Sequence, residues 1–164
     1  MRNDRTAQKA LYDHFAPYMM ALALRYVGDA DTAQDVVQEA FIKIFGSLHQ
    51  FTAHGSLGSW VRRITLNAAL EFLRSRNVFA CIEDDEVMQM PTMNVSVIEK
   101  MQTDELMQLI AMLPAGYRTV FNMYAIEGYS HKEIAEQLGI QESSSRSQYI
   151  RAKMFLQKKL EKYK

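Results

Sequence analysis

The segment 130–140 constrains the fold of this chain more than any other stretch. Ser130 and Glu133 have the spacing of a capping box, in which each side chain satisfies a free backbone N–H at the start of a helix. Leu138 lies one helical turn or more further on, and Gly139 follows it, a residue that adopts a left-handed turn conformation without steric cost. These features in register predict a helix-turn-helix rather than an ordinary helical hairpin.

The helix expected after this turn, over 142–163, has two different faces when it rotates by about 100° per residue. The side predicted to pack consists of Tyr149, Ala152, Leu156 and Leu160. The opposite side is polar and cationic near the helix start, where a recognition helix meets base edges and phosphates. That outward side consists of Ser143, Arg146, Ser147, Ile150 and Arg151. Two residues depart from the usual pattern: Gln141 is a poor cap, and Ser145 occupies a turn position where a buried Val is common.

Apolar residues recur every three or four positions along most of the chain, and only 7 Gly and 3 Pro interrupt its 164 residues. This pattern predicts an all-α protein. In the first half we expect helices over 5–27, 31–45 and 59–76, capped at Asp31 or Thr32 and at Ser59, with Gly28 and Gly46 as stops. In the second half we expect helices over 104–112, 115–127, 131–138 and 142–163.

An acidic stretch with Pro91 separates the two helical halves. It predicts two small helical domains, 1–80 and 103–164, joined by a linker over 81–102. The single cysteine, Cys81, excludes an internal disulfide framework and suits a reducing compartment. No apolar run has the roughly 20 residues needed to cross a bilayer, and the polar N-terminus does not resemble a secretory signal. We therefore expect a cytoplasmic protein.

The formal net charge of zero hides an uneven distribution. Residues 81–104 hold six acidic residues and one basic residue, whereas residues 105–164 hold nine basic and six acidic ones. Such asymmetry favours a polyanion partner at the C-terminal end. A solvated surface helix with a lysine-rich tail explains the same charges, so charge alone leaves both interpretations open.

The helix expected over 59–76 has a polar face with an aromatic ring at one end. An indole stacks on unstacked bases, Arg holds the backbone and Asn reads a base edge. The alternative is that Trp60 anchors the core and the arginines are only solvated. The residues on this face are Trp60, Arg63, Asn67, Glu71 and Arg74.

Motifs for catalysis are absent from the sequence. The four histidines have no metal-ligand spacing, and there is no Gly-rich phosphate loop, nucleophile elbow or Cys–His pair. We therefore expect no catalytic residues, no metal site, no cofactor and no small-molecule substrate, and we expect that the protein is not an enzyme.

Four longer runs resemble the sigma-70 family of RNA polymerase sigma factors, most closely the extracytoplasmic-function (ECF) type of Bacteroidetes-like bacteria. Residues 29–45 and 55–70 resemble the promoter-opening domain of that family, and residues 113–121 and 127–135 resemble its −35-reading domain. The two blocks occur in the family's order and span nearly the whole chain. The resemblance implies a monomeric factor that binds core polymerase, recognises −10 and −35 promoter elements and directs transcription initiation.

The resemblance also implies roles for individual residues. Core polymerase binding, through the β′ clamp helices, would involve Asp35, Gln38 and Glu39. Contact with the −10 element would involve Phe51, His54, Trp60, Arg63 and Asn67. Contact with the −35 element would involve Ser143, Arg146, Ser147, Ile150 and Arg151. The expected partners are core polymerase (β′ clamp helices and β flap), promoter DNA and an anti-sigma factor.

Two other classes of function remain as alternatives. One is a stand-alone helix-turn-helix transcriptional regulator, which needs a dimer seam and a palindromic operator. The other is a protein-binding adaptor that does not touch DNA. The sequence shows no dimer seam, and the basic tail disfavours the adaptor.

Overall fold

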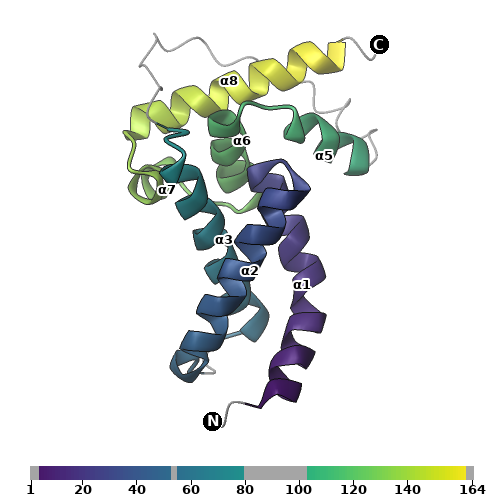
Figure 1. Ribbon diagram of the computed structural model, residues 1–164. Helices are drawn as coiled ribbons and strands as arrows, with labels where there is room; N and C mark the ends of the chain where they lie inside the picture. The colour runs from purple at the N-terminus through teal and green to yellow at the C-terminus, as the bar shows by residue number, and fades with distance from the viewer. Residues whose placement is uncertain (1–3, 53–54, 80–102, 162–164) are drawn as a thin grey trace. The chain divides into compact units, whose positions relative to one another are not determined.

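We analysed a computed structural model that describes residues 4–52, 55–79 and 103–161. All regular elements in these ranges are helices, which confirms the all-α prediction (Figure 1). The chain divides into two compact units, Met1–Arg76 and Asn77–Lys164. The predicted linker 81–102 lies entirely outside the described residues, so the boundaries 1–80 and 103–164 remain predictions.

The first helix, α1 (Arg5–Val27), matches its predicted range. The Asp4 carboxylate accepts hydrogen bonds from the backbone N–H groups of Thr6 and Ala7, at 2.9 and 3.3 Å, and so caps the helix start. Gly28 ends the helix in a left-handed conformation, with φ of 90°, and its N–H donates to the Leu24 carbonyl. The predicted stop at Gly28 is confirmed.

The second helix, α2 (Ala30–Ser47), differs from its prediction at both ends. Asp29, rather than Asp31 or Thr32, is the cap, because its extended backbone lets its carboxylate accept from the Thr32 N–H at 2.8 Å. The helix also runs through Gly46, which was wrongly predicted to end it. The chain continues directly into a short 3-10 helix, η1 (Leu48–Gln50).

The third helix, α3 (Leu57–Ser75), begins two residues before the predicted start. The predicted cap, Ser59, is wrong: Ser56 has the extended backbone of a cap, and its hydroxyl accepts from the Ser59 N–H at 3.3 Å. The helices α1, α2 and α3 pack against one another, and each contributes one apolar stripe to a shared core. The largest fully buried side chains of this core are Tyr26, Val36, Ile44, Val61 and Leu70.

The second unit is built from α5 (Thr103–Ala111), α6 (Ala115–Phe121), a π-helical segment η2 (Asn122–Ile126), α7 (His131–Leu138) and α8 (Glu142–Glu161). The predicted helix over 115–127 is thus realised as α6 continued by η2. The helix α8 contacts α5, α6 and α7. One apolar cluster of the unit consists of Leu109, Ile110, Leu113, Ala152, Leu156 and Leu160.

The helix-turn-helix predicted from the sequence is present in α7 and α8. The Ser130 N–H donates to Glu133 Oε2 at 2.8 Å, and the Glu133 N–H donates to Ser130 Oγ at 3.3 Å, which completes the capping box. Gly139 has φ of 69° and ends α7 in the predicted left-handed conformation. Of the side of α8 predicted to pack, Ala152, Leu156 and Leu160 are buried and Tyr149 is half-buried.

None of the described helices is long and apolar enough to cross a membrane.

The change of cap at α3 is testable by two serine substitutions. We expect Ser56→Ala to lower the free energy of unfolding of the first unit by about 1 kcal/mol, because a free N–H at the helix start loses its acceptor. Ser59→Ala should leave it unchanged within about 0.5 kcal/mol. The measurement is urea denaturation followed by the fluorescence of Trp60, the one tryptophan of the chain. Equal losses in the two variants, or a larger loss for Ser59→Ala, would contradict the assignment.

Candidate nucleic-acid and partner interfaces

The polar face of α3 presents the predicted combination of an aromatic ring, a cation and an amide. Arg63 and Asn67 are exposed, one helical turn apart, and Trp60 is half-buried at the start of the same face. The Trp60 ring lies beside the Phe51 ring, with centroids 5.5 Å apart and planes inclined by 50°. Trp60 is therefore neither a fully buried core anchor nor a freely solvated ring. His54, predicted for the same surface, lies outside the described residues.

Such an arrangement has a definite chemical capacity. Aromatic rings stack on unpaired bases of any sequence, at about 1–3 kcal/mol per base, and guanidinium groups hold the sugar–phosphate backbone. The exposed amide of Asn67 supplies both a donor and an acceptor for a base edge. The face suits a single nucleic-acid strand better than a duplex, whose bases do not offer their planes for stacking.

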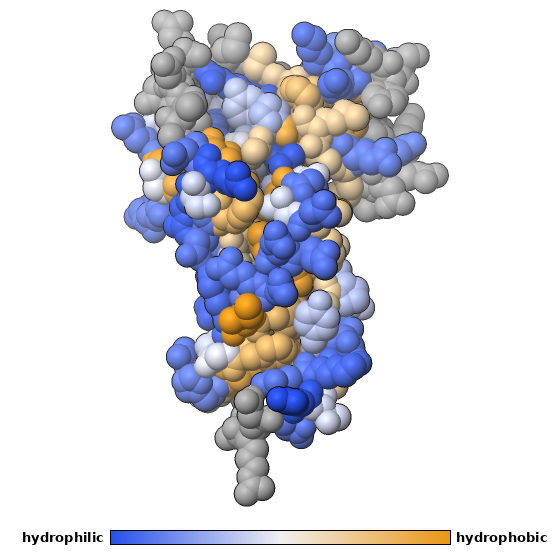
Figure 2. All heavy atoms as spheres, in the orientation of Figure 1, coloured by the Kyte–Doolittle hydropathy of each residue, from blue (hydrophilic) through white to orange (hydrophobic). Residues whose placement is uncertain are grey.

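The outer face of α2 brings together the three residues predicted to contact core polymerase. Asp35, Gln38 and Glu39 are all exposed and lie within one turn of each other. Ile42, one turn further, is 68% exposed and adds a large apolar side chain to this face. Figure 2 shows hydrophilic residues over much of the visible side of α2, with a hydrophobic patch among them. The combination of charge, amide and apolar surface is suited to a protein partner.

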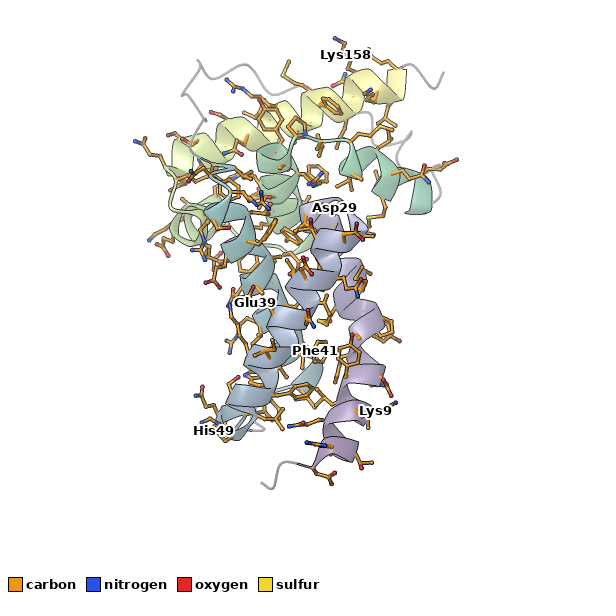
Figure 3. All side chains as sticks on the ribbon, in the orientation of Figure 1. Lys9, Asp29, Glu39, Phe41, His49 and Lys158 are labelled. Atoms are coloured by element: carbon orange, nitrogen blue, oxygen red, sulfur yellow. The ribbon has the colours of Figure 1, made fainter. Side chains whose placement is uncertain are left out.

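Phe41 and Glu39 leave α2 in different directions (Figure 3). Phe41 is buried, and its ring lies 4.7 Å from the ring of Tyr12 on α1. Glu39 is exposed, and its carboxylate pairs with the Lys43 ammonium at 2.9 Å. Helix α2 therefore packs through one side while the other stays available for a partner.

Lys43 links α2 to α3 through a second ion pair. Its Nζ lies 2.7 Å from Glu71 Oε2 on α3, in addition to the contact with Glu39. The hydrogen bonds to Glu71 and Glu39 raise the pKa of Lys43, and the hydrogen bond to Lys43 lowers the pKa of Glu71. Sequence analysis missed Lys43. The spacing of Glu39 and Lys43 could have signalled their pairing, but nothing local signals Glu71, 28 positions away.

The start of α8 carries the predicted cationic surface. Ser143 and Arg146 are exposed, and the Arg146 guanidinium pairs with the Glu142 carboxylate one turn earlier. Ser147 and Arg151 are half-buried. A hydroxyl and guanidinium groups on one side of a helix start can reach phosphates and base edges in a groove.

Ile150 requires a correction. The helical wheel places it with Arg146 on the side away from the apolar core of the unit, and it was expected to be exposed there. In the structure it is only 7% exposed. Wheel position alone does not determine exposure, and an isoleucine gains free energy when its apolar surface is removed from water. We therefore do not keep Ile150 as a surface contact.

His131, the first residue of α7, contacts the start of α8 through a hydrogen bond. Its Nδ1 and the Ser145 hydroxyl are 3.0 Å apart and share a hydrogen bond, and both residues are buried. The imidazole stacks on Tyr124, with centroids 4.3 Å apart and planes 11° apart, and contacts the ring of Tyr149 at 5.8 Å. Ser145, which departs from the usual turn pattern, is thus paired with a histidine to which the sequence assigned no role.

The environment of His131 disfavours its charged form. Burial is the largest cause of a lowered pKa, the nearby Arg146 lowers the pKa further, and Glu142 partly opposes the shift. These surroundings therefore favour the neutral form of the His131 imidazole. Within the described ranges, no group of three or more His, Cys, Asp or Glu side chains is placed to hold a metal ion.

Comparisons with known proteins match both units. The family model described as "Sigma-70 region 2" matches residues 11–78, and that described as "Sigma-70, region 4" matches residues 103–156. The RNA polymerase sigma-H factor of Pseudomonas aeruginosa is 30% identical over 98% of this chain and 89% of its own length. The ECF RNA polymerase sigma-E factor of Haemophilus influenzae is 29% identical over 98% of this chain and 90% of its own length.

A solved structure shares the fold. It is the sigma factor RpoE from Bartonella quintana, determined in complex with the anti-sigma factor NepR. The TM-score is 0.54 at 22% identity, and the alignment covers 94% of this chain and 96% of that one. At this identity the likeness extends to the fold alone.

The buried histidine leads to a prediction about pH. The pKa of His131 in the folded chain lies below its ordinary value of 6.5, so between the two values the unfolded chain binds more protons than the folded chain. We expect the contribution of His131 to stability to be complete above about pH 6.5 and to be lost progressively as the pH falls toward its folded-state pKa. Urea denaturation followed by far-ultraviolet circular dichroism from pH 7.5 to 5.5 measures this loss.

The control is His131→Gln, which keeps a polar side chain but cannot titrate. The variant should show a weaker fall in stability over the same pH range. The same fall in both proteins would mean that His131 does not titrate as its surroundings imply.

Proposed function

This chain belongs to the sigma-70 family of RNA polymerase sigma factors and to its ECF type, and from that membership we propose how its parts carry out the function. It binds core RNA polymerase, recognises the −10 and −35 promoter elements and directs transcription initiation. The proposal concerns which residues perform each task. It assigns residues 1–80 to core binding and promoter opening and residues 103–164 to −35 recognition, with 81–102 as an acidic tether.

We assign promoter opening to the exposed polar face of α3. Phe51 and Trp60 would stack on unpaired bases of the −10 element, Arg63 would hold the strand backbone, and Asn67 would read a base edge. Removing a base from the duplex stack costs a few kcal/mol, and stacking returns about 1–3 kcal/mol per base. Strand separation is then driven by binding energy. We also assign His54 to this surface, from the sequence alone.

We assign recognition of the −35 element to helix α8. Ser143, Arg146, Ser147 and Arg151 would contact the duplex from the helix start, the part of a recognition helix that enters the major groove. The neutral His131–Ser145 pair would hold that start in place. Arg146 already has an anionic partner, Glu142, so we expect it to exchange that carboxylate for phosphate or guanine when DNA binds.

The tether is long enough for two promoter elements. The 22 residues from 81 to 102, when extended, cover roughly 70–80 Å, and two turns of DNA measure roughly 70 Å. Its negative charge would repel DNA and suit a cationic channel of the polymerase.

The proposed partners follow from the family and from the outer face of α2. Asp35, Gln38 and Glu39 would contact the β′ clamp helices of core polymerase, and the second unit would contact the β flap. An anti-sigma factor would bind the free protein; the Bartonella quintana factor was determined in complex with the anti-sigma factor NepR. We further propose a monomer in the cytoplasm of a Bacteroidetes-type bacterium. Sigma factors are transcription initiation factors rather than enzymes, and we propose no catalysis, cofactor or small-molecule substrate here.

Run-off transcription tests the function directly. Transcript start sites mapped after overexpression identify a promoter, which then serves as template. We expect the purified chain to bind this duplex weakly by itself and to direct run-off transcription once core polymerase is added. Tight operator binding without any effect of core polymerase would instead identify a stand-alone regulator, and no binding of DNA in either state would identify an adaptor.

The role of Trp60 predicts a selective defect. Trp60→Ala should reduce promoter opening by about tenfold, because one stacking contact of about 1–3 kcal/mol is lost, while closed-complex formation stays nearly unchanged. Permanganate reactivity of unpaired thymines measures opening, and footprinting of the duplex measures the closed complex. Tyr18→Ala, which removes a 68% exposed ring from α1, is the matched control and should affect neither step. Equal losses in opening and closed-complex formation for Trp60→Ala would refute its role.

A further inference from the structure

Lys43 lies between the two surfaces that the proposed function assigns to different partners. Its ammonium contacts Glu39, on the face of α2 assigned to core polymerase, at 2.9 Å. It also contacts Glu71, on the face of α3 assigned to the −10 strand, at 2.7 Å. The three side chains remain 41–61% exposed, so all of them are accessible to partners.

The carboxylate of Glu71 puts a negative charge on the face of α3 that is assigned to the negatively charged DNA strand. It is exposed one turn after Asn67 and three residues before Arg74, which also lowers the pKa of its carboxyl group. A strand bound along Arg63 and Asn67 would bring its phosphates toward this carboxylate. Like charges at close range repel one another, and a free carboxylate would also compete with phosphate for the neighbouring guanidinium groups.

We propose that Lys43 is a positioning residue of the DNA-opening surface: it neutralises Glu71 and holds that carboxylate on the α2 side of α3, away from the bound strand. This inference rests on the proposed function and adds to it a residue from outside the DNA-reading helix. Arg63 then acts on the strand without competition from Glu71. Because the same ammonium holds Glu39, the polymerase-binding helix and the DNA-reading helix are joined at this point.

A purely structural role does not account well for this arrangement. Exposed ion pairs contribute little to folding stability, since solvent screens them and two long side chains lose conformational freedom. The charge at Glu71 matters most when a polyanion approaches the surface. The effect of Lys43 should therefore appear in promoter opening and be small in unfolding.

A double-mutant cycle on the polymerase holoenzyme tests the proposal. Lys43→Met should reduce the formation of open complex about three- to tenfold, because Glu71 loses the ammonium that pairs with it. Glu71→Gln alone should leave opening unchanged or improve it. The double variant should recover most of the loss, and Lys43→Arg should retain activity, since a guanidinium can hold both carboxylates.

Lys9→Met is the matched control. It removes the same charge and another exposed ion pair, that between Lys9 and Asp13 on α1, at 2.6 Å; Lys9 is 77% exposed and Lys43 41%. We expect no change in opening for this variant. Permanganate reactivity on the mapped promoter is the readout, with urea denaturation of each variant to confirm folding and competition with wild-type factor to measure affinity for core polymerase.

Three results would overturn the inference. Normal opening with Lys43→Met means that the residue has no role in this step. A loss that Glu71→Gln does not restore means that Lys43 acts directly on phosphate or otherwise, and not through Glu71. A loss matched by weaker affinity for core polymerase places the effect at Glu39. If the proposed function itself fails, the wild-type chain will show no core-dependent transcription, an outcome distinct from all three.

Discussion

Burial of one apolar stripe per helix is the constraint on which the rest of the first unit depends. The helices α1, α2 and α3 each bury one set of apolar residues against the others, and α2 and α3 each keep an opposite face in solvent. On α2 that face carries Asp35, Gln38, Glu39 and Ile42, and on α3 it carries Arg63 and Asn67. Two surfaces of different chemistry therefore arise from one small core. The packing of the three helices on one another sets the geometry of each surface.

Polar contacts between neighbouring helices determine the charge of the surfaces that the apolar core positions. In the first unit, Lys43 crosses from α2 to Glu71 on α3. In the second unit, His131 on α7 reaches Ser145 on α8. Both contacts lie beside residues assigned to DNA, and both affect the charge there. Lys43 neutralises the Glu71 carboxylate, and the surroundings of His131, which include Arg146, favour its neutral form. An interface for a polyanion depends on such neighbours as much as on the side chains that touch it.

Sequence analysis located most helices because their determinants are local. Apolar periodicity marked 5–27 and 131–138, and the capping box with Gly139 marked the helix-turn-helix. Of the polar face predicted on α3, the residues Arg63, Asn67, Glu71 and Arg74 are exposed and Trp60 is half-buried. Caps were less predictable, because several Asp, Ser and Thr residues lie at or near the starts of α2 and α3. The backbone is extended at Asp29 and Ser56, and these two residues are the caps. The site assignments on α2, α3 and α8 remain predictions awaiting the polymerase and its promoter.

The sequence by itself determined which residues form helices and which side of most helices is apolar, because these properties depend on residues three or four positions apart. Only the tertiary structure decided how the helices meet. It paired Lys43 with Glu71 across 28 positions and His131 with Ser145 across 14, and it buried Ile150 on a side of α8 that periodicity assigned to solvent. A helical wheel carries no information about the neighbouring element, and each of these contacts depends on that neighbour.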